Sequence, residues 1–269
     1  MKPVIRSKRG TRVILIGLIA WIALSPKVRA VSPPPDGGYP GGNTAEGQNA
    51  LLNLTTGGFN TAVGYFSLES VMAGNFNTGV GAGTLISNTA NNNTATGAAG
   101  LLSNTTGTNN TADGAFALLN NTTGNDKTGA GASALSSNTQ GDGNTATGSG
   151  ALSRNTTGSL NTAVGAATLP NNTTGNDNTA VGLNSLFSNT TANNNTAVGR
   201  AAMGANTTGN DNTAIGWFAL ASNTNGIENT AAGFQALRNN LGPINPPLSQ
   251  EGTQNTAPGQ YVWPGQHRD

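Results

Sequence analysis

The chain has 269 residues, of which 39 are glycine and none is cysteine, and only 9% are charged. Without cysteine, the chain forms neither disulfides nor thiolate metal sites. Seven of the twelve basic residues lie within the first 30 residues, so the rest of the chain carries five basic and eleven acidic side chains, a net charge of −6. This excess of acid argues against nucleic acid and against anionic membrane surfaces as partners.

Residues 1–30 have the composition of a secretory signal peptide. A basic start precedes an apolar run from Val13 to Leu24, and Val28-Arg29-Ala30 provides a small-x-small cleavage site. The apolar run is shorter than the roughly 20 residues that a membrane-spanning helix needs. We therefore expect export with cleavage, a secreted or cell-surface location and no stable transmembrane anchor afterwards; an uncleaved anchor is the alternative.

Residues 31–42 form a Pro/Gly-rich segment that cannot stack regularly, so we expect an extended linker or cap. Residues 43–242 then contain twelve copies of a 17-residue unit, Asn-Thr-Ala-Val-Gly-x-x-Ala-Leu-x-x-Asn-Thr-Thr-Gly-x-x, with a single step of 16 residues from Asn77 to Asn93. Position two is Thr and position five is Gly in every copy, and position nine is Leu except at Met203. Such a constant register indicates that every copy occupies the same structural slot.

The unit is too short for two helices and a turn, and Gly, Asn and Thr are poor helix formers. It suits one coil with two short strands and two corners, the Asn-Thr-Thr-Gly segment supplying turn chemistry. The prediction is therefore an all-β fold, a parallel β-solenoid of about twelve 17-residue coils. At about 4.8 Å per coil, the stack would be a rod roughly 55 to 60 Å long.

The predicted core is thin, because position eight holds only small residues beside the leucine of position nine. One buried leucine contributes about 1.5 to 3 kcal/mol, which barely offsets an ordering cost of about 1 to 2 kcal/mol per residue. Stacked amides and hydroxyls are expected to add hydrogen bonds along the rod. The predicted leucine ladder consists of Leu51, Leu68, Leu85, Leu101, Leu118, Leu135, Leu152, Leu169, Leu186, Leu220 and Leu237.

Position four is apolar in half of the copies and polar or charged in others such as Glu46 and Asp113, so it is not expected to be enclosed within one chain. An apolar stripe along a rod can bury itself against another chain, which predicts a homo-oligomer. The alternative is a half-exposed strand face in a monomer. The predicted stripe consists of Val63, Val80, Val164, Val181, Val198 and Ile215.

The segments Asn161 to Leu169 and Asn178 to Leu186 show the whole Asn-Thr-Ala-Val-Gly core followed by a small residue and Leu. This pattern resembles the head repeats of trimeric autotransporter adhesins of the YadA type, which implies a left-handed parallel β-roll and favours a trimer. The resemblance covers residues 43 to about 241, although the usual unit of that family is nearer 14 residues. Similar repeats occur in phage tail-fibre-like proteins, which leaves a receptor-binding shaft as the alternative function.

Residues 243–269 form a Pro-rich tail or cap with neither the heptads of a stalk nor the alternating strands of a membrane anchor. A lone Asn255-Thr256-Ala257-Pro258-Gly259 echoes the repeat, and its proline is expected to end the stack. We therefore expect an exported structural rod that is a surface adhesin or fibre module, with an unknown surface or matrix ligand.

The sequence offers little for catalysis, and we expect no enzyme, cofactor or metal site. The single histidine, His267, stands three residues from the end of the sequence. Asp126, Asp177 and Asp211 share one repeat position, which predicts solvated corner residues and not a paired acid and base. The chain also lacks the Gly-Gly-x-Gly-x-Asp repeat of calcium-binding rolls.

Three surface features have competing interpretations. Asn-x-Thr sequons in the corners are candidate glycosylation sites or turn geometry alone. The Thr column from Thr105 to Thr207 has the spacing of an ice-binding face. Aromatic residues such as Phe116 and Trp217 at positions six and seven form either an exposed adhesive patch or packing within an oligomer. The candidate sequons are Asn104, Asn121, Asn155, Asn172, Asn189 and Asn206.

Overall fold

The computed structural model describes residues 39–240 and 256–258, and in these ranges it contains strands and turns only. No helix in these ranges could cross a membrane. Thirteen strands of three residues form a single sheet in chain order. They are β1 (Thr44–Glu46), β2 (Thr61–Val63), β3 (Thr78–Val80), β4 (Thr94–Thr96), β5 (Thr111–Asp113), β6 (Thr128–Ala130), β7 (Thr145–Thr147), β8 (Thr162–Val164), β9 (Thr179–Val181), β10 (Thr196–Val198), β11 (Thr213–Ile215), β12 (Thr230–Ala232) and β13 (Thr256–Pro258).

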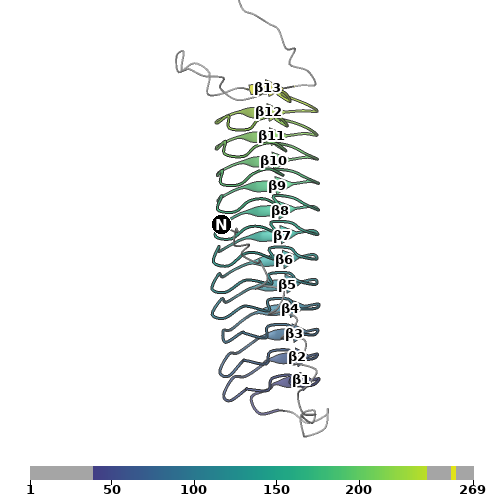
Figure 1. Cartoon of the computed structure of the whole chain (residues 1–269), viewed down its shortest axis with the longest axis vertical. Helices are drawn as coiled ribbons and strands as arrows, with labels where there is room; N and C mark the ends of the chain where they lie inside the picture. The colour runs from purple at the N-terminus through teal and green to yellow at the C-terminus, as the bar shows by residue number, and fades with distance from the viewer. Residues whose placement is uncertain (1–38, 241–255, 259–269) are drawn as a thin grey trace, which may run out of the picture.

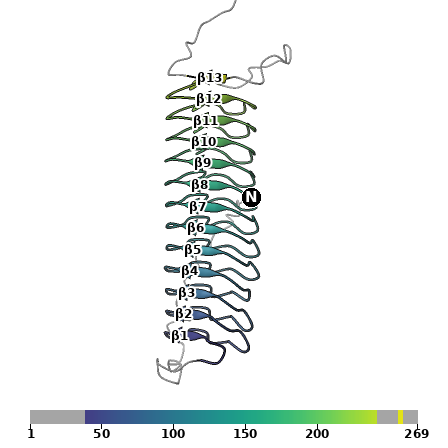
Figure 2. The ribbon, with the colours of Figure 1, turned by 180° about the vertical axis from the view of Figure 1, so that it is seen from behind.

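The predicted parallel β-solenoid is confirmed, and each repeat forms one coil. Every strand pairs in parallel with the strand of the next coil, with equivalent residues opposite each other, as in Thr162 with Thr179. The stack of coils is a straight rod with all strands on one side (Figures 1 and 2). Residues that share a repeat position therefore form a column along the rod.

The 16-residue step does not disturb this register. Thr78 still pairs with Thr94, because the missing residue falls in the corner from Asn88 to Asn92, away from the strands. Strand pairing therefore keeps equivalent residues opposite each other, and only the corner becomes shorter.

Each coil contains one strand, so the prediction of two strands per coil is wrong. The side opposite the strand still forms bonds between coils, for example from the Leu68 N–H to the Thr84 carbonyl at 2.9 Å. However, Phe66 and Leu68 at positions seven and nine have φ angles of 55° and 53°. This left-handed backbone is incompatible with an extended strand, even though the residues stack in register.

The predicted leucine ladder is confirmed as the core. Its members from Leu68 to Leu220 are fully buried, Leu51 is 7% exposed, and Leu237 is partly buried at the end of the stack. The middle residue of each strand from β1 to β12, such as Ala163, also points inward and is buried. The core is therefore a leucine column flanked by two columns of small residues, at positions three and eight.

Two buried columns of asparagine supply the hydrogen bonds that the thin core needs. At position one, Asn178 Nδ2 donates to Asn161 Oδ1 at 3.0 Å and to the Ala192 carbonyl at 2.8 Å. At position twelve, Asn172 Nδ2 donates to Asn155 Oδ1 at 2.8 Å. Because these amides are fully buried and paired, they link the coils without the cost of an unsatisfied polar group.

The isolated copy in the tail adds a strand to the sheet. β13 pairs in parallel with β12, Thr256 lying opposite Thr230 and Pro258 opposite Ala232. It is the last strand of the described sheet. The sheet thus includes residues that lie beyond the predicted end of the repeat domain at residue 242.

Candidate functional site

The predicted sequons lie inside the rod. All six asparagines of the set from Asn104 to Asn206 are fully buried in the position-twelve column. Asn121 Nδ2, for example, donates to Asn104 Oδ1 at 2.6 Å and to the Gly124 carbonyl at 3.0 Å. A glycan would have to be attached to this same nitrogen atom. The structure therefore argues against glycosylation of the folded chain at these six residues and gives them a structural role.

The two threonine columns differ in how their hydroxyls are used. In the column proposed for ice binding, the hydroxyls donate to the next coil, as in Thr105 Oγ1 to the Thr122 carbonyl at 2.9 Å. The position-two threonines of β1 to β12 lie on the outer face of the sheet. In the described part of the chain, their hydroxyls have no hydrogen-bond partner. The free hydroxyl row therefore lies on the strands and not at the predicted column.

The predicted position-four stripe also lies on the outer face of the sheet. Val63, Val80, Val164 and Ile215 are 37 to 49% exposed, and Val181 and Val198 are half-buried. In the middle of the rod, the column is interrupted by polar or small residues from Thr96 to Thr147. A single chain thus leaves the apolar stripe partly in contact with solvent, and the homo-oligomer remains a prediction.

The acidic residues do not converge. Asp126, Asp177 and Asp211 are exposed at position seventeen, and Asn109 Nδ2 donates to Asp126 Oδ1 at 2.9 Å. Burial raises the pKa of the Glu69 carboxyl. Within residues 39–240, no group of three or more His, Asp and Glu side chains could hold a metal ion. His267 lies outside the described residues.

Lys127 is a buried cation that the sequence analysis did not single out. It replaces the position-one asparagine and is only 1% exposed. Its Nζ donates to the Gly141 carbonyl at 2.9 Å. Burial lowers the pKa of this ammonium to about 8, although the nearby Asp142 and Asp126 act in the opposite direction. Lys127 has no side-chain oxygen to accept the Asn144 N–H, so it interrupts the amide column.

Aromatic and arginine side chains meet on the last coils of the repeat. We call Arg200, Trp217, Phe218, Phe234 and Arg238 the aromatic–arginine patch. The Trp217 ring lies 5.4 Å from the Phe234 ring and 5.6 Å from the Phe218 ring. The Arg200 guanidinium lies 5.7 Å from the centre of the Trp217 ring, and that of Arg238 lies 5.0 Å from the centre of the Phe218 ring.

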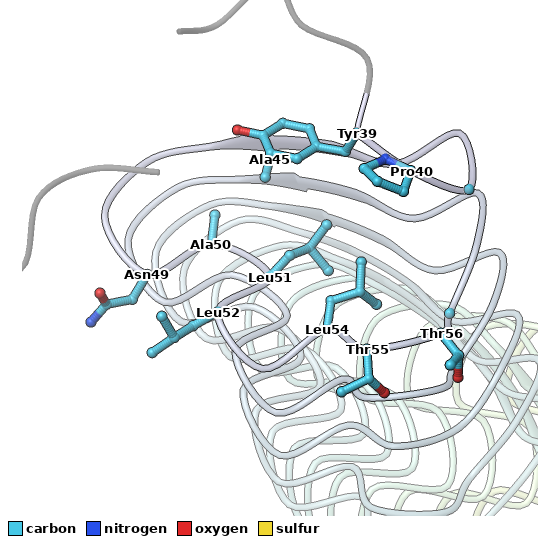
Figure 3. Close-up of a pocket in the computed structure, with 12 residues that line it drawn as sticks. Tyr39, Pro40, Ala45, Asn49, Ala50, Leu51, Leu52, Leu54, Thr55 and Thr56 are labelled. Atoms are coloured by element: carbon cyan, nitrogen blue, oxygen red, sulfur yellow. The ribbon is translucent and has the colours of Figure 1, made fainter. Parts of the chain in front are cut away.

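A hollow of about 410 Å³ opens at the N-terminal end of the rod. Figure 3 shows Ala50, Leu51 and Leu54 pointing into it, and Tyr39 lying across β1 at its rim. The lining includes the core residues Ala45, Ala50 and Leu51 of the first coil, and the described residues place no further coil against them. The hollow is therefore the exposed end of the core, and it contains no cluster of catalytic groups.

No family model, curated protein or solved structure matches the chain.

Proposed function

We propose that this chain is an exported, non-enzymatic rod that serves as a surface adhesin or extracellular fibre module. The proposal rests on one observation, which is that the residues of the inward columns are nearly constant whereas those of the outward columns vary. The inward columns are nearly constant, and their amides and leucines hold the coils together. The outward columns at positions six, seven, sixteen and seventeen vary from coil to coil, and they are where a rod can present a ligand-binding surface.

Export and display can be tested by expressing the full chain with its leader in a secretion-competent host. We expect the cleaved chain on the cell surface or in the medium, with its mass reduced by residues 1–30. Digestion by protease added to intact cells would demonstrate surface exposure. A chain that stays in the cytosol with an intact leader would contradict the proposal.

The outer stripe supports a homotrimer as the working form. Exposed valine and isoleucine side chains gain about 25 cal/mol for each Å² removed from water, so the apolar stretches on either side of the interruption from Thr96 to Thr147 favour side-by-side association. The resemblance to trimeric adhesin heads favours three chains over two. Light scattering should therefore give three times the mass of one chain.

A matched pair of variants separates this interface from general changes in the surface. Val164→Asp with Val181→Asp places charge on the outer stripe and should give monomers. Leu160→Asp changes a residue that is 61% exposed at a corner, and it should leave the mass unchanged. A monomeric wild-type chain would exclude the trimer but not the exported rod.

Ice binding is a second candidate, because the free threonine hydroxyls repeat on the strands of a straight sheet. Such an array can order water at regular intervals. Inhibition of ice recrystallisation by micromolar protein tests it. Thr162→Leu with Thr179→Leu should abolish the inhibition, and Thr156→Leu with Thr173→Leu should not. If three chains associate through this face of the sheet and the protein does not inhibit ice recrystallisation, ice binding is excluded.

A further inference from the structure

Position six changes character towards the C-terminal end of the rod. In the coils from Ala82 to Ala166 it holds only alanine or serine. In the last four coils it holds Leu183, Arg200, Trp217 and Phe234 in turn. The first two coils hold Gln48 and Tyr65 at this position. Because the six coils from Ala82 to Ala166 form with alanine or serine there, the coil itself does not require a large side chain.

Folding stability does not explain the patch either. Trp217 remains 46% exposed and Phe234 38% exposed, so much of their apolar surface stays in water. Exposed aromatic surface gathered on adjacent coils is more typical of a binding surface than of a core.

The patch is a positive region on an acidic rod. Residues 39–240 contain eight acidic and four basic side chains, and two of the four are Arg200 and Arg238. Within these residues, both guanidinium groups lie over aromatic rings without an ion-pair or hydrogen-bond partner. By contrast, Arg154 donates to Asn171 Oδ1 at 2.9 Å. The patch arginines therefore keep their hydrogen-bond donors available for an anion.

We propose that the aromatic–arginine patch binds an acidic saccharide. The C–H faces of a pyranose ring pack on the exposed Trp217 and Phe234 rings, and a sugar carboxylate or sulfate accepts hydrogen bonds from Arg200 or Arg238. The acidic remainder of the rod repels the same polymer, which confines it to the patch. This inference rests on the proposed function as an adhesin, and it names the class of ligand.

Isothermal titration calorimetry on the secreted wild-type chain provides the test. The probes are oligogalacturonate, which carries carboxylates, chondroitin sulfate, which carries both anionic groups, and neutral dextran. We expect binding of at least one acidic probe and weaker binding as sodium chloride is raised. Trp217→Ala should weaken binding about tenfold, equivalent to ~1.4 kcal/mol. Arg200→Gln with Arg238→Gln should have an effect of similar size.

The matched controls are Phe116→Ala, an aromatic residue 50% exposed in the middle of the rod, and Arg154→Gln. Both should bind like the wild type, and circular dichroism should show that every variant is folded. Dextran that binds as tightly as the acidic probes would overturn the role of charge. Poly-glutamate that binds as tightly would overturn the saccharide.

Failure of this inference can be distinguished from failure of the proposed function. If the wild-type chain binds no acidic probe, or if the patch variants bind like the controls, the inference is wrong although the rod can still be exported and displayed. If the chain is not exported, the proposed function is wrong, whatever the calorimetry shows for the patch.

Discussion

Lys127 is the one position in its buried column where the side chain cannot accept a hydrogen bond from the next coil. We predict that Lys127→Asn stabilises the rod by about 2 kcal/mol, since it restores amide bonds to Asn144 and removes a buried charge. Urea unfolding followed by circular dichroism measures the change. The reciprocal control, Asn161→Lys, should destabilise the rod; a gain in that variant would contradict the explanation.

The same lysine predicts a pH dependence. Its pKa is about 8 in the folded chain and near 10.5 in the unfolded chain. Between these values the unfolded chain binds one more proton, so the free energy of unfolding rises with pH. The full cost of the buried charge is present below pH 8 and has disappeared above the unfolded pKa. Urea unfolding gives the free energy of unfolding of the wild-type chain and of Lys127→Asn at each pH. The wild-type value should rise relative to that of the variant between pH 8 and the unfolded pKa. The same pH dependence in both proteins would refute this prediction.

Two neighbouring glycines should respond very differently to substitution by alanine. Gly148 has a φ of 129°, and an added Cβ would lie 2.5 Å from the Gly165 carbonyl oxygen of the next coil. Gly150 has a φ of 68° and open space around it, and Ala167 occupies the equivalent position with a φ of 47°. We expect Gly148→Ala to cost more than about 3 kcal/mol and Gly150→Ala about 1 kcal/mol. Similar urea midpoints would contradict this steric argument.

The sequence predicted the contents of the columns better than the backbone that carries them. The constant leucine and the small residue before it indicated an interior, which the structure confirms. Nothing in a leucine indicates a left-handed conformation, yet Leu135 has a φ of 53°. The bond from its N–H to the Ala151 carbonyl and its buried side chain impose that conformation through the stack, and a single copy cannot reveal it.

At the scale of the element, the coil is the repeating unit, and its three-residue strand sets the register. Contacts run mainly between adjacent coils, so the stability of such a rod is approximately a sum of coil and interface contributions. The 16-residue coil demonstrates that a corner can lose a residue while the strands stay paired. Length can therefore change in a corner, or by a whole coil, without loss of register.

This organisation predicts the outcome of two deletions. Removal of residues 161–177 takes out one complete coil and joins two equivalent corners, so the shortened rod should fold with a similar circular dichroism spectrum. Removal of residues 161–169 takes out the strand and one leucine and leaves a half-coil. We expect that variant to lose the cooperative unfolding transition. Equal behaviour of the two deletions would show that the coil is not the unit.

The aromatic–arginine patch depends on contacts between adjacent coils, which the repeat sequence does not reveal. The sequence contains aromatic residues at positions six and seven, but a single copy of the repeat does not connect them with Arg200 and Arg238. Their proximity depends on the stacking of adjacent coils, which places position ten of one coil near position seven of the preceding coil. The change of position six from alanine to large residues was the available signal.

For the whole molecule, the stack has two ends with different exposure. An inner coil has neighbours on both sides, whereas the first coil leaves a hollow at its core. We predict that amide hydrogen exchange is slowest in β5 to β9 and fastest in β1 and β13, because the two end strands of the described sheet open without breaking a second interface. Hydrogen exchange with mass spectrometry would reveal this gradient. Uniform exchange along the rod would indicate all-or-none opening instead.

The two buried asparagine columns give the side-chain interior of the rod a direction. In each column the side-chain N–H group points toward the N-terminal end and the amide oxygen accepts from the following coil, as between Asn178 and Asn161 and between Asn172 and Asn155. Aligned amide dipoles add, as they do in a helix, with the positive end at the N-terminus. At the opposite end, the buried Asn223 Oδ1 has no partner within the described residues. The direction of these side-chain bonds thus distinguishes the N-terminal end of the rod from its C-terminal end.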